Sequence, residues 1–119
     1  MRIALIPGDG IGAEVVDQAV LVLEAAEREF GFSLEKTHFD WGANRYLRDG
    51  TTLPEGAVEM FQNGFDAILL GAVGDPRVPD NRHAADILLG LRVKLDLYIN
   101  LRPVKLYHER LCPLKNRFK

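Results

Sequence analysis

Near its beginning the chain reads Arg2-Ile3-Ala4-Leu5-Ile6-Pro7-Gly8-Asp9-Gly10-Ile11-Gly12. A short apolar run rich in branched residues, stopped by a proline and glycines, is typical of a buried strand that enters a tight turn. The period then changes, because apolar side chains recur every three or four positions from Ile11 to about Phe30, and Gly31 ends the pattern. This stretch therefore predicts a strand, a glycine turn and a long helix.

The rest of the chain continues the alternation. The predicted elements are a strand over 33–41, short helices within 42–52 and 53–61, a strand over 65–71, a helix over 84–95 and a third apolar strand over 97–101. Strands that alternate with helices in this way favour the α/β class, in which helices flank a mainly parallel sheet on both faces.

The composition is typical of one soluble globular domain. Of the 119 residues 47% are apolar, and the formal net charge is −2. No run approaches the roughly 20 apolar residues of a membrane span, and the first apolar run is too short for a signal peptide, so we expect no membrane association and a cytoplasmic location. The single Cys112 and the lack of zinc-type spacing exclude a disulfide or zinc scaffold. Cys112 is expected to be inert, and His38, His83 and His108 are expected at the surface.

Charge is distributed unevenly along the chain. Acidic residues predominate in 1–91 and basic residues in 92–119. A basic segment can indicate a nucleic acid or an anionic ligand, or can pair with acidic residues elsewhere. Because no basic and aromatic residues interleave, and no DNA-reading motif accompanies them, we expect no nucleic-acid partner.

Two glycine turns and two arginines are candidates for ligand binding. The turn at Gly8–Gly12 precedes a helix, and Gly71–Pro76 follows a buried strand, at the sheet edge where open parallel sheets bind ligands. By themselves both are equally compatible with ordinary turns, and the first lacks the dinucleotide-binding spacing. Arg92 and Arg102 could grip two carboxylates of one substrate in bidentate fashion, or could pair with surface acids.

Taken together, four motifs resemble the beta-decarboxylating dehydrogenases, and among these most closely the 3-isopropylmalate dehydrogenases. The motifs are Ile6-Pro7-Gly8-Asp9-Gly10-Ile11-Gly12-Ala13-Glu14, Leu70-Gly71-Ala72-Val73-Gly74, Leu88-Leu89-Gly90-Leu91-Arg92 and Asn100-Leu101-Arg102-Pro103. They follow one another in the family's order along nearly the whole chain, which corresponds to about the first third of a family member. The resemblance implies NAD-linked oxidation of a 2-hydroxy dicarboxylic acid, followed by loss of its beta-carboxylate, with a bound Mg²⁺ or Mn²⁺ as Lewis acid.

The resemblance also implies roles for individual residues. Arg92 and Arg102 correspond to arginines that hold substrate carboxylates. Leu88 and Leu89 correspond to apolar side chains beside the substrate's branched tail, although packing in the helix core explains them equally well. Ile11, Gly74 and Asp75 correspond to positions beside the nicotinamide cofactor.

The family's catalytic Tyr and Lys and its metal-binding aspartates correspond to positions beyond Lys119. We therefore expect residues 1–119 to be the N-terminal portion of a truncated sequence, with no catalytic or metal-binding residue of its own and no activity alone. The complete protein is expected to be a homodimer, and the choice between NAD and NADP stays open.

Several departures leave alternatives. Ala13 replaces the usual proline of the first loop, and Ala85 stands where 3-isopropylmalate dehydrogenases carry an acidic residue. The stretch 73–80 is similar to tartrate and D-malate dehydrogenases of the same family, which are the alternative within it. An alternative of another class is a non-catalytic α/β domain that binds an anion or pairs with a complementing chain.

Overall fold

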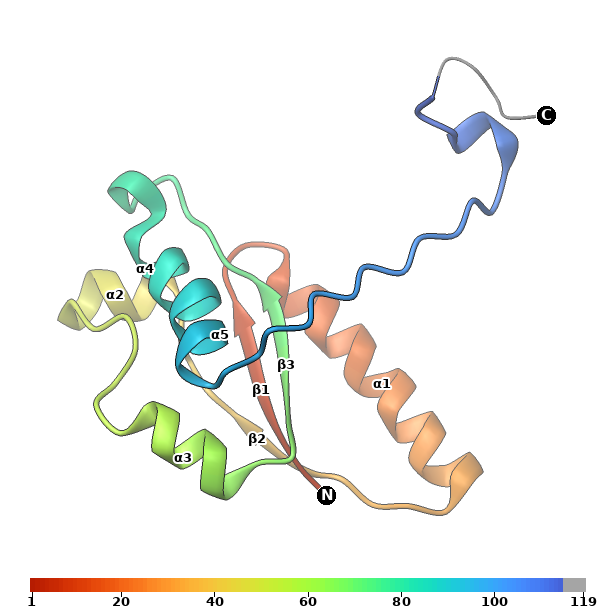
Figure 1. The fold of residues 1–119 in the computed structure, drawn as a ribbon, viewed down its shortest axis with the longest axis horizontal. Coiled ribbons are helices and arrows are strands. Elements are labelled where there is room, and N and C mark those ends of the chain that lie inside the picture. The colour runs from red at the N-terminus through yellow and green to blue at the C-terminus, as the bar shows by residue number, and fades with distance from the viewer. Residues whose placement is uncertain (115–119) are drawn as a thin grey trace.

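A three-stranded parallel sheet forms the centre of the structure, a computed structural model that describes residues 1–114 (Figure 1). The strands are β1 (Arg2–Gly8), β2 (Glu35–His38) and β3 (Ala67–Ala72), in the spatial order β2-β1-β3. The helical elements are α1 (Gly12–Phe30), α2 (Ala43–Asp49), α3 (Ala57–Gly64), η1 (Pro79–Asn81), α4 (Arg82–Ala85), η2 (Asp86–Gly90), α5 (Leu91–Lys94) and η3 (Glu109–Leu111). The predicted α/β class is confirmed.

The middle strand, β1, is completely buried at its centre. It pairs in parallel with both neighbours, and Leu5 lies opposite His38 of β2 and Leu69 of β3. Ala4, Leu5 and Ile6 are completely buried. A strand with neighbours on both edges and helices on both faces has no solvent-facing side, which is why its sequence is a continuous apolar run.

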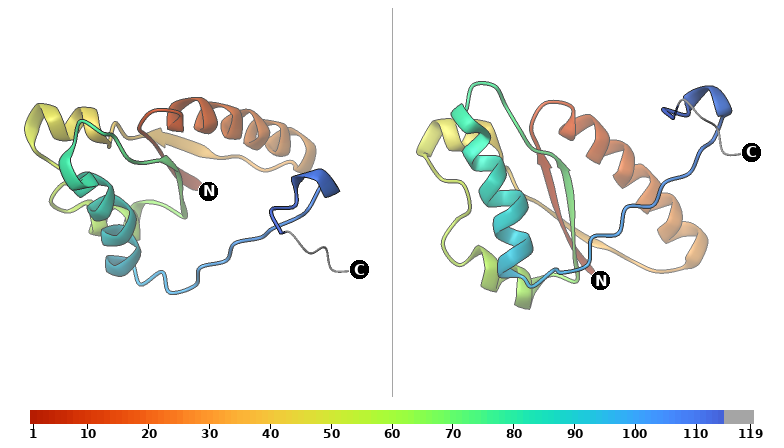
Figure 2. Two further views of the ribbon diagram at one scale, coloured as in Figure 1. Left: turned by 90° about the horizontal axis from the view of Figure 1, so that it is seen from above. Right: turned by 45° about the horizontal axis from the view of Figure 1, so that its top comes forward.

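Helices cover the two faces of the sheet, as Figure 2 shows. α1 packs on one face, where it contacts β1 and β3. α3 and the helical segment 82–94 cover the other face (Figure 1). Because successive side chains of a strand point to opposite faces, Ala4 and Ile6 lie on the α3 side and Leu5 lies on the α1 side.

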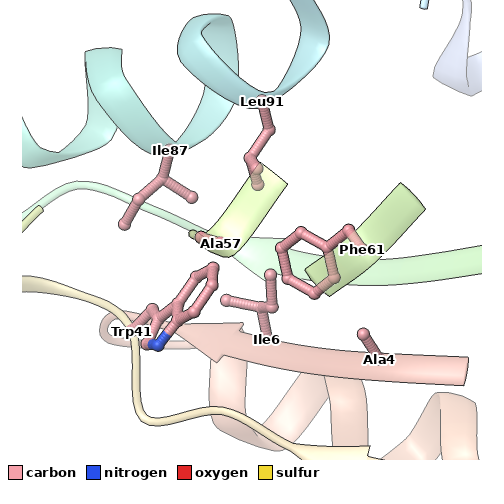
Figure 3. Close-up of a cluster of buried hydrophobic side chains, with 7 residues drawn as sticks. All are labelled: Ala4, Ile6, Trp41, Ala57, Phe61, Ile87 and Leu91. Atoms are coloured by element: carbon pink, nitrogen blue, oxygen red, sulfur yellow. The ribbon is translucent and has the colours of Figure 1, made fainter. Parts of the chain in front are cut away.

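An aromatic cluster holds the shorter elements to the α3 side of the sheet, and Figure 3 shows two of its members, Trp41 and Phe61. Phe61 of α3 lies at its centre, with the ring centroids of Phe39, Trp41 and Phe65 at 5.5, 5.2 and 5.6 Å. These pairs meet edge to face, the arrangement that aromatic quadrupoles favour. The rings connect α3 to the segments that follow β2 and precede β3.

The predicted helix over 84–95 is confirmed, and it begins slightly earlier. α4, η2 and α5 follow one another without a break from Arg82 to Lys94. The middle turn, η2, is π-helical, a local widening that is often found at functional sites. Ile87 and Leu91 are the buried residues of η2 and α5 and pack into the core shown in Figure 3.

The predicted strand over 97–101 is wrong. Residues 97–108, which we call the C-terminal arm, form neither strand nor helix. The first of them lie beside β3, and the chain then runs away from the sheet and helices (Figures 1 and 2). The chain turns at Asp96, whose φ is 54°, and the Leu97 amide donates back to the Arg92 carbonyl at 2.9 Å. A strand forms only where its backbone groups hydrogen-bond to a neighbouring strand, and residues 97–101 form no such ladder with the edge strand β3. Alternating apolar residues indicate only which side chains share a face.

Close backbone contacts join the end of β1 to the start of α1 and to β3. A Cβ placed on Gly12 would lie 2.1 Å from the Pro7 carbonyl oxygen, and one on Gly71 would lie 2.2 Å from the same atom. Any side chain at these positions would push the three segments apart. Glycine is required at Gly12 and Gly71 by packing, independently of any ligand.

We therefore predict that Gly71→Ala destabilises the protein by about 1–3 kcal/mol through overpacking against the Pro7 carbonyl. Gly64→Ala is the matched control, because a Cβ there meets no atom within 4 Å, and we expect it to be neutral or slightly stabilising. Denaturant unfolding monitored by Trp41 fluorescence measures both variants. Equal stability of the two would contradict the packing argument.

Candidate functional site

The loops that follow β1 and β3 meet at the carboxyl edge of the sheet. The Asp9 amide donates to the Ala72 carbonyl at 2.6 Å, and the Gly12 amide donates to the Asp9 carbonyl at 2.8 Å. The first bond joins the two loops, and the second closes the turn that starts α1. In open parallel sheets this edge is where ligands bind.

The Asp9 carboxylate connects three separate segments. Its Oδ1 accepts from the Ala43 amide at 2.6 Å, at the start of α2. Its Oδ2 accepts from the Gly74 amide at 2.9 Å and from Nε2 of His83 at 2.7 Å. Asp9 is buried, so the carboxylate exchanges water for three protein donors. It ties β1 to α2, to the turn after β3 and to α4.

The expectation of a surface position is wrong for His83, which is completely buried. It lies between Asp9 and Tyr46, whose ring stacks on the imidazole with a centroid distance of 6.1 Å. Its contact with Asp9 spans 74 positions, so no spacing rule in the sequence could reveal it. His38 and His108 are exposed, as predicted.

The three predicted cofactor-binding residues lie on this same edge. Ile11 is 64% exposed although it is apolar. Gly74 is exposed, and a Cβ placed on it would meet nothing nearer than Asn81 Oδ1 at 3.6 Å. An exposed branched side chain and a bare glycine are compatible with contact to a flat ring such as nicotinamide. Their role in cofactor binding stays a prediction.

Asp75, the third of these residues, is held in a bidentate ion pair with Arg77. Arg77 Nε lies 2.9 Å from Asp75 Oδ1, and Arg77 Nη2 lies 2.7 Å from Oδ2. These side-chain bonds, followed by a bond from the Arg77 amide, lower the pKa of Asp75 from 3.8 to about 2. Arg77 Nη2 also donates to Asn44 at 2.8 Å, which connects the turn to α2.

A second candidate region lies on the opposite side of β3 from β1. A surface cavity of about 230 Å³ opens here, lined by Ile68, Leu70, Ile87, Leu88, Leu91, Arg92, Leu97 and Ile99. Leu88 is 42% exposed, and Arg92 is half-buried. The structure thus brings one predicted apolar contact and one predicted carboxylate-binding arginine into a single cavity.

The other two predicted substrate residues lie outside this cavity. Leu89 is 63% exposed and is not among the lining residues. Arg102 lies on the exposed arm, whose first residues line the cavity before the chain leaves β3. Within residues 1–114, neither Arg92 nor Arg102 makes a side-chain ion pair or hydrogen bond, so both guanidinium groups are available to an anion. Their roles stay predictions.

The geometry defines an α/β protein with two candidate binding regions. One lies at the carboxyl ends of the parallel strands, and the other is the cavity beside β3 that contains Arg92. The family model for isocitrate/isopropylmalate dehydrogenase matches residues 2–119, and the chain belongs to this family. It is 53% identical over 116 residues to the 3-isopropylmalate dehydrogenase of Bifidobacterium longum (strain DJO10A). The matched region covers 97% of this chain and 33% of the relative. The corresponding enzyme of Corynebacterium urealyticum is 50% identical over 117 residues, or 98% of this chain and 33% of the relative.

A solved structure shows the same fold. The apo form of the beta-decarboxylating dehydrogenase from Thermococcus kodakarensis has a TM-score of 0.61 and 34% identity, over 82% of this chain and 27% of that chain. The chain therefore spans about a third of the length of the curated relatives it matches. The predicted resemblance to the family is confirmed.

Residues 1–114 contain neither a candidate membrane span nor a candidate metal centre. No helix among them has the length and apolar character needed to cross a membrane. No three side chains of His, Cys, Asp or Glu within this part of the chain form a group suited to a metal ion.

The ion pair between Asp75 and Arg77 predicts how the Asp75 carboxyl group titrates. Because its pKa is lower in the folded state than in the unfolded state, the pair contributes stability above about pH 4, and this contribution is lost as the pH falls towards 2. In Arg77→Gln we expect the pKa of Asp75 to rise towards 3.8, as measured from the carboxyl ¹³C shift. Arg82→Gln removes the same charge without touching Asp75 and should leave its pKa near 2. An unchanged pKa of Asp75 in Arg77→Gln would show that the Arg77 side chain is not what lowers it.

Proposed function

We propose that the complete protein carrying this chain is a 3-isopropylmalate dehydrogenase, which oxidises a 2-hydroxy diacid with a branched apolar tail and then decarboxylates it. The observation that carries this proposal is that relatives 46–53% identical over nearly the whole chain bear that name. The cavity beside Arg92 supports it, because that cavity combines a guanidinium with apolar side chains. Such a lining suits a substrate that has both a carboxylate and an aliphatic tail.

The reaction removes two electrons and one carboxylate from the substrate. The hydroxyl carbon loses a hydride and the hydroxyl oxygen loses a proton, which forms a 2-oxo acid. The bond to the beta-carboxylate then breaks, CO₂ leaves, and the remaining electron pair forms an enolate that takes up a proton. When bound, NAD would serve as the hydride acceptor, and Mg²⁺ or Mn²⁺ would supply Lewis acidity.

In this proposal Arg92 binds one substrate carboxylate and holds it against the neighbouring apolar wall. A planar guanidinium suits this task because it donates two parallel hydrogen bonds to a carboxylate. Leu88, which lines the same cavity, contacts the branched tail. Arg102 contributes the second guanidinium once the arm that carries it packs against the substrate region.

Ile11, Gly74 and Asp75 contact the nicotinamide end of the cofactor in the same proposal. They follow β1 and β3 directly, so the sheet edge sets their separation. The proton-transfer and metal-binding residues belong to the rest of the complete protein. We further propose that this protein is a cytoplasmic homodimer.

Arg92 tests the proposed carboxylate contact. We expect Arg92→Ala in the complete protein to lower kcat/KM for 3-isopropylmalate by about ten- to a hundredfold, the usual effect of losing a charge-assisted contact. Arg28→Ala, near the end of α1, is the matched control and should retain full activity. Steady-state assays of NADH formation measure both. Normal kinetics in Arg92→Ala would exclude the assigned role.

Leu88 tests the choice of substrate. We expect Leu88→Ala to lower kcat/KM for 3-isopropylmalate by about tenfold and to leave that for D-malate within about twofold, because only the branched tail loses apolar contact. Leu21→Ala removes an exposed leucine from α1 and should change neither rate. A wild-type protein that prefers D-malate would instead support the alternative within the family.

A further inference from the structure

A buried contact between His83 and Asp9 lies beneath the loops that carry the predicted cofactor-binding residues. It has no part in the proposed chemistry. His83 Nε2 lies 2.7 Å from Asp9 Oδ2, with both side chains almost completely removed from solvent. A carboxylate oxygen accepts, so Nε2 is the nitrogen that carries the proton. The other ring nitrogen, Nδ1, is buried without a hydrogen-bond partner among residues 1–114.

The His83 contact controls the orientation of the Asp9 carboxylate. Oδ2 is shared between His83 and the Gly74 amide, while Oδ1 accepts from Ala43. The carboxylate is also packed tightly, because a Cβ on Gly42 would lie 2.5 Å from Oδ1. Removal of the imidazole would leave Oδ2 with one donor and an adjoining void, so the carboxylate could turn away from Gly74.

The segment that contains His83 makes a second contact with the Gly74–Asp75 turn, through a hydrogen bond. Asn81, two residues earlier, accepts from the Asp75 amide at 3.1 Å through its side-chain oxygen. Asp80 and Asn81 both have positive φ, 58° and 47°, which is uncommon for residues other than glycine. The backbone thus adopts an unfavourable conformation where it brings Asn81 and His83 to the back of this turn. Segment 81–83 therefore contacts the Asp75 amide directly, through Asn81, and the Gly74 amide indirectly, through His83 and Asp9.

We infer that His83 is a positioning residue for the nicotinamide cofactor: through Asp9 it orients the Gly74 peptide and the turn that carries Asp75. This inference rests on the proposed function, since it assumes that the turn contacts NAD. His83 itself is buried and touches neither cofactor nor substrate. Its effect is on the affinity for NAD, while the chemical step depends on other groups.

The test compares two amide substitutions in the complete protein. His83→Gln places its amide nitrogen close to the position of Nε2 and can still donate to Asp9, whereas the shorter His83→Asn reaches only the position of Nδ1. His38→Asn makes the same exchange at an exposed histidine and serves as the control. For each variant we would measure Kd for NAD by isothermal titration calorimetry, KM for NAD, kcat at saturation, and Tm.

We expect His83→Asn to raise both Kd and KM for NAD by about tenfold, as the loss of one hydrogen bond to a charged group would, with kcat changed less than about threefold. His83→Gln should restore both constants to within about twofold of wild type, and His38→Asn should match wild type. A lower Tm with unchanged Kd for NAD in His83→Asn would overturn the inference and leave a purely structural role. Equal losses in Gln and Asn would also overturn it.

The two proposals fail in different ways. A wild-type protein that binds no NAD and oxidises no 2-hydroxy diacid would refute the proposed function, whatever the variants do. A wild-type protein that does both, with His83→Asn binding NAD normally, would refute the positioning role alone. If His83→Asn does not fold, Asp9→Asn replaces it, since that substitution turns one carboxylate oxygen into a donor and should weaken NAD binding in the same way.

Discussion

The hydrogen bonds to the Asp9 carboxylate are the interaction on which the candidate cofactor-binding edge of the sheet depends. The carboxylate accepts three hydrogen bonds from segments that lie 34, 65 and 74 positions away along the chain. A buried carboxylate with fewer donors would be strongly unfavourable, so the three segments stabilise one another through Asp9. The loop after β1, the start of α2, the turn after β3 and α4 therefore form one unit.

Glycine packing around the Pro7 carbonyl explains how the loops joined by Asp9 can lie so close to the sheet. The Pro7 carbonyl lies where glycines at positions 12 and 71 let α1 and β3 approach it, and Asp9 then follows within reach of the Gly74 amide. The glycine motif thus has a structural reason at Gly12 and Gly71 that is independent of any ligand. Gly74, whose surroundings are open, is a different case and remains available for contact with a cofactor.

The second candidate region is the cavity that contains Arg92, and it lies between the edge strand β3 and the start of the C-terminal arm. The cavity beside Arg92 is bounded by β3, by η2 and α5, and by the first residues of the arm, while Leu101 and Val104 further along are 82% and 93% exposed. Apolar side chains of this kind are normally covered in a folded protein. Arg92 is placed by a helix that packs on the core, whereas Arg102 depends on where the arm lies.

Local sequence by itself determined the α/β class, the positions of β1, α1 and β3, and the family, because apolar periodicity and short motifs act through neighbours in the chain. Only the tertiary structure decided that His83 is buried against Asp9, that Leu88 and not Leu89 lines the cavity with Arg92, and that residues 97–101 form no strand. Each of these depends on a partner far away in the sequence or on an available sheet edge. Local periodicity carries no information about either, since a hydrogen bond across 74 residues exists only once the chain has folded.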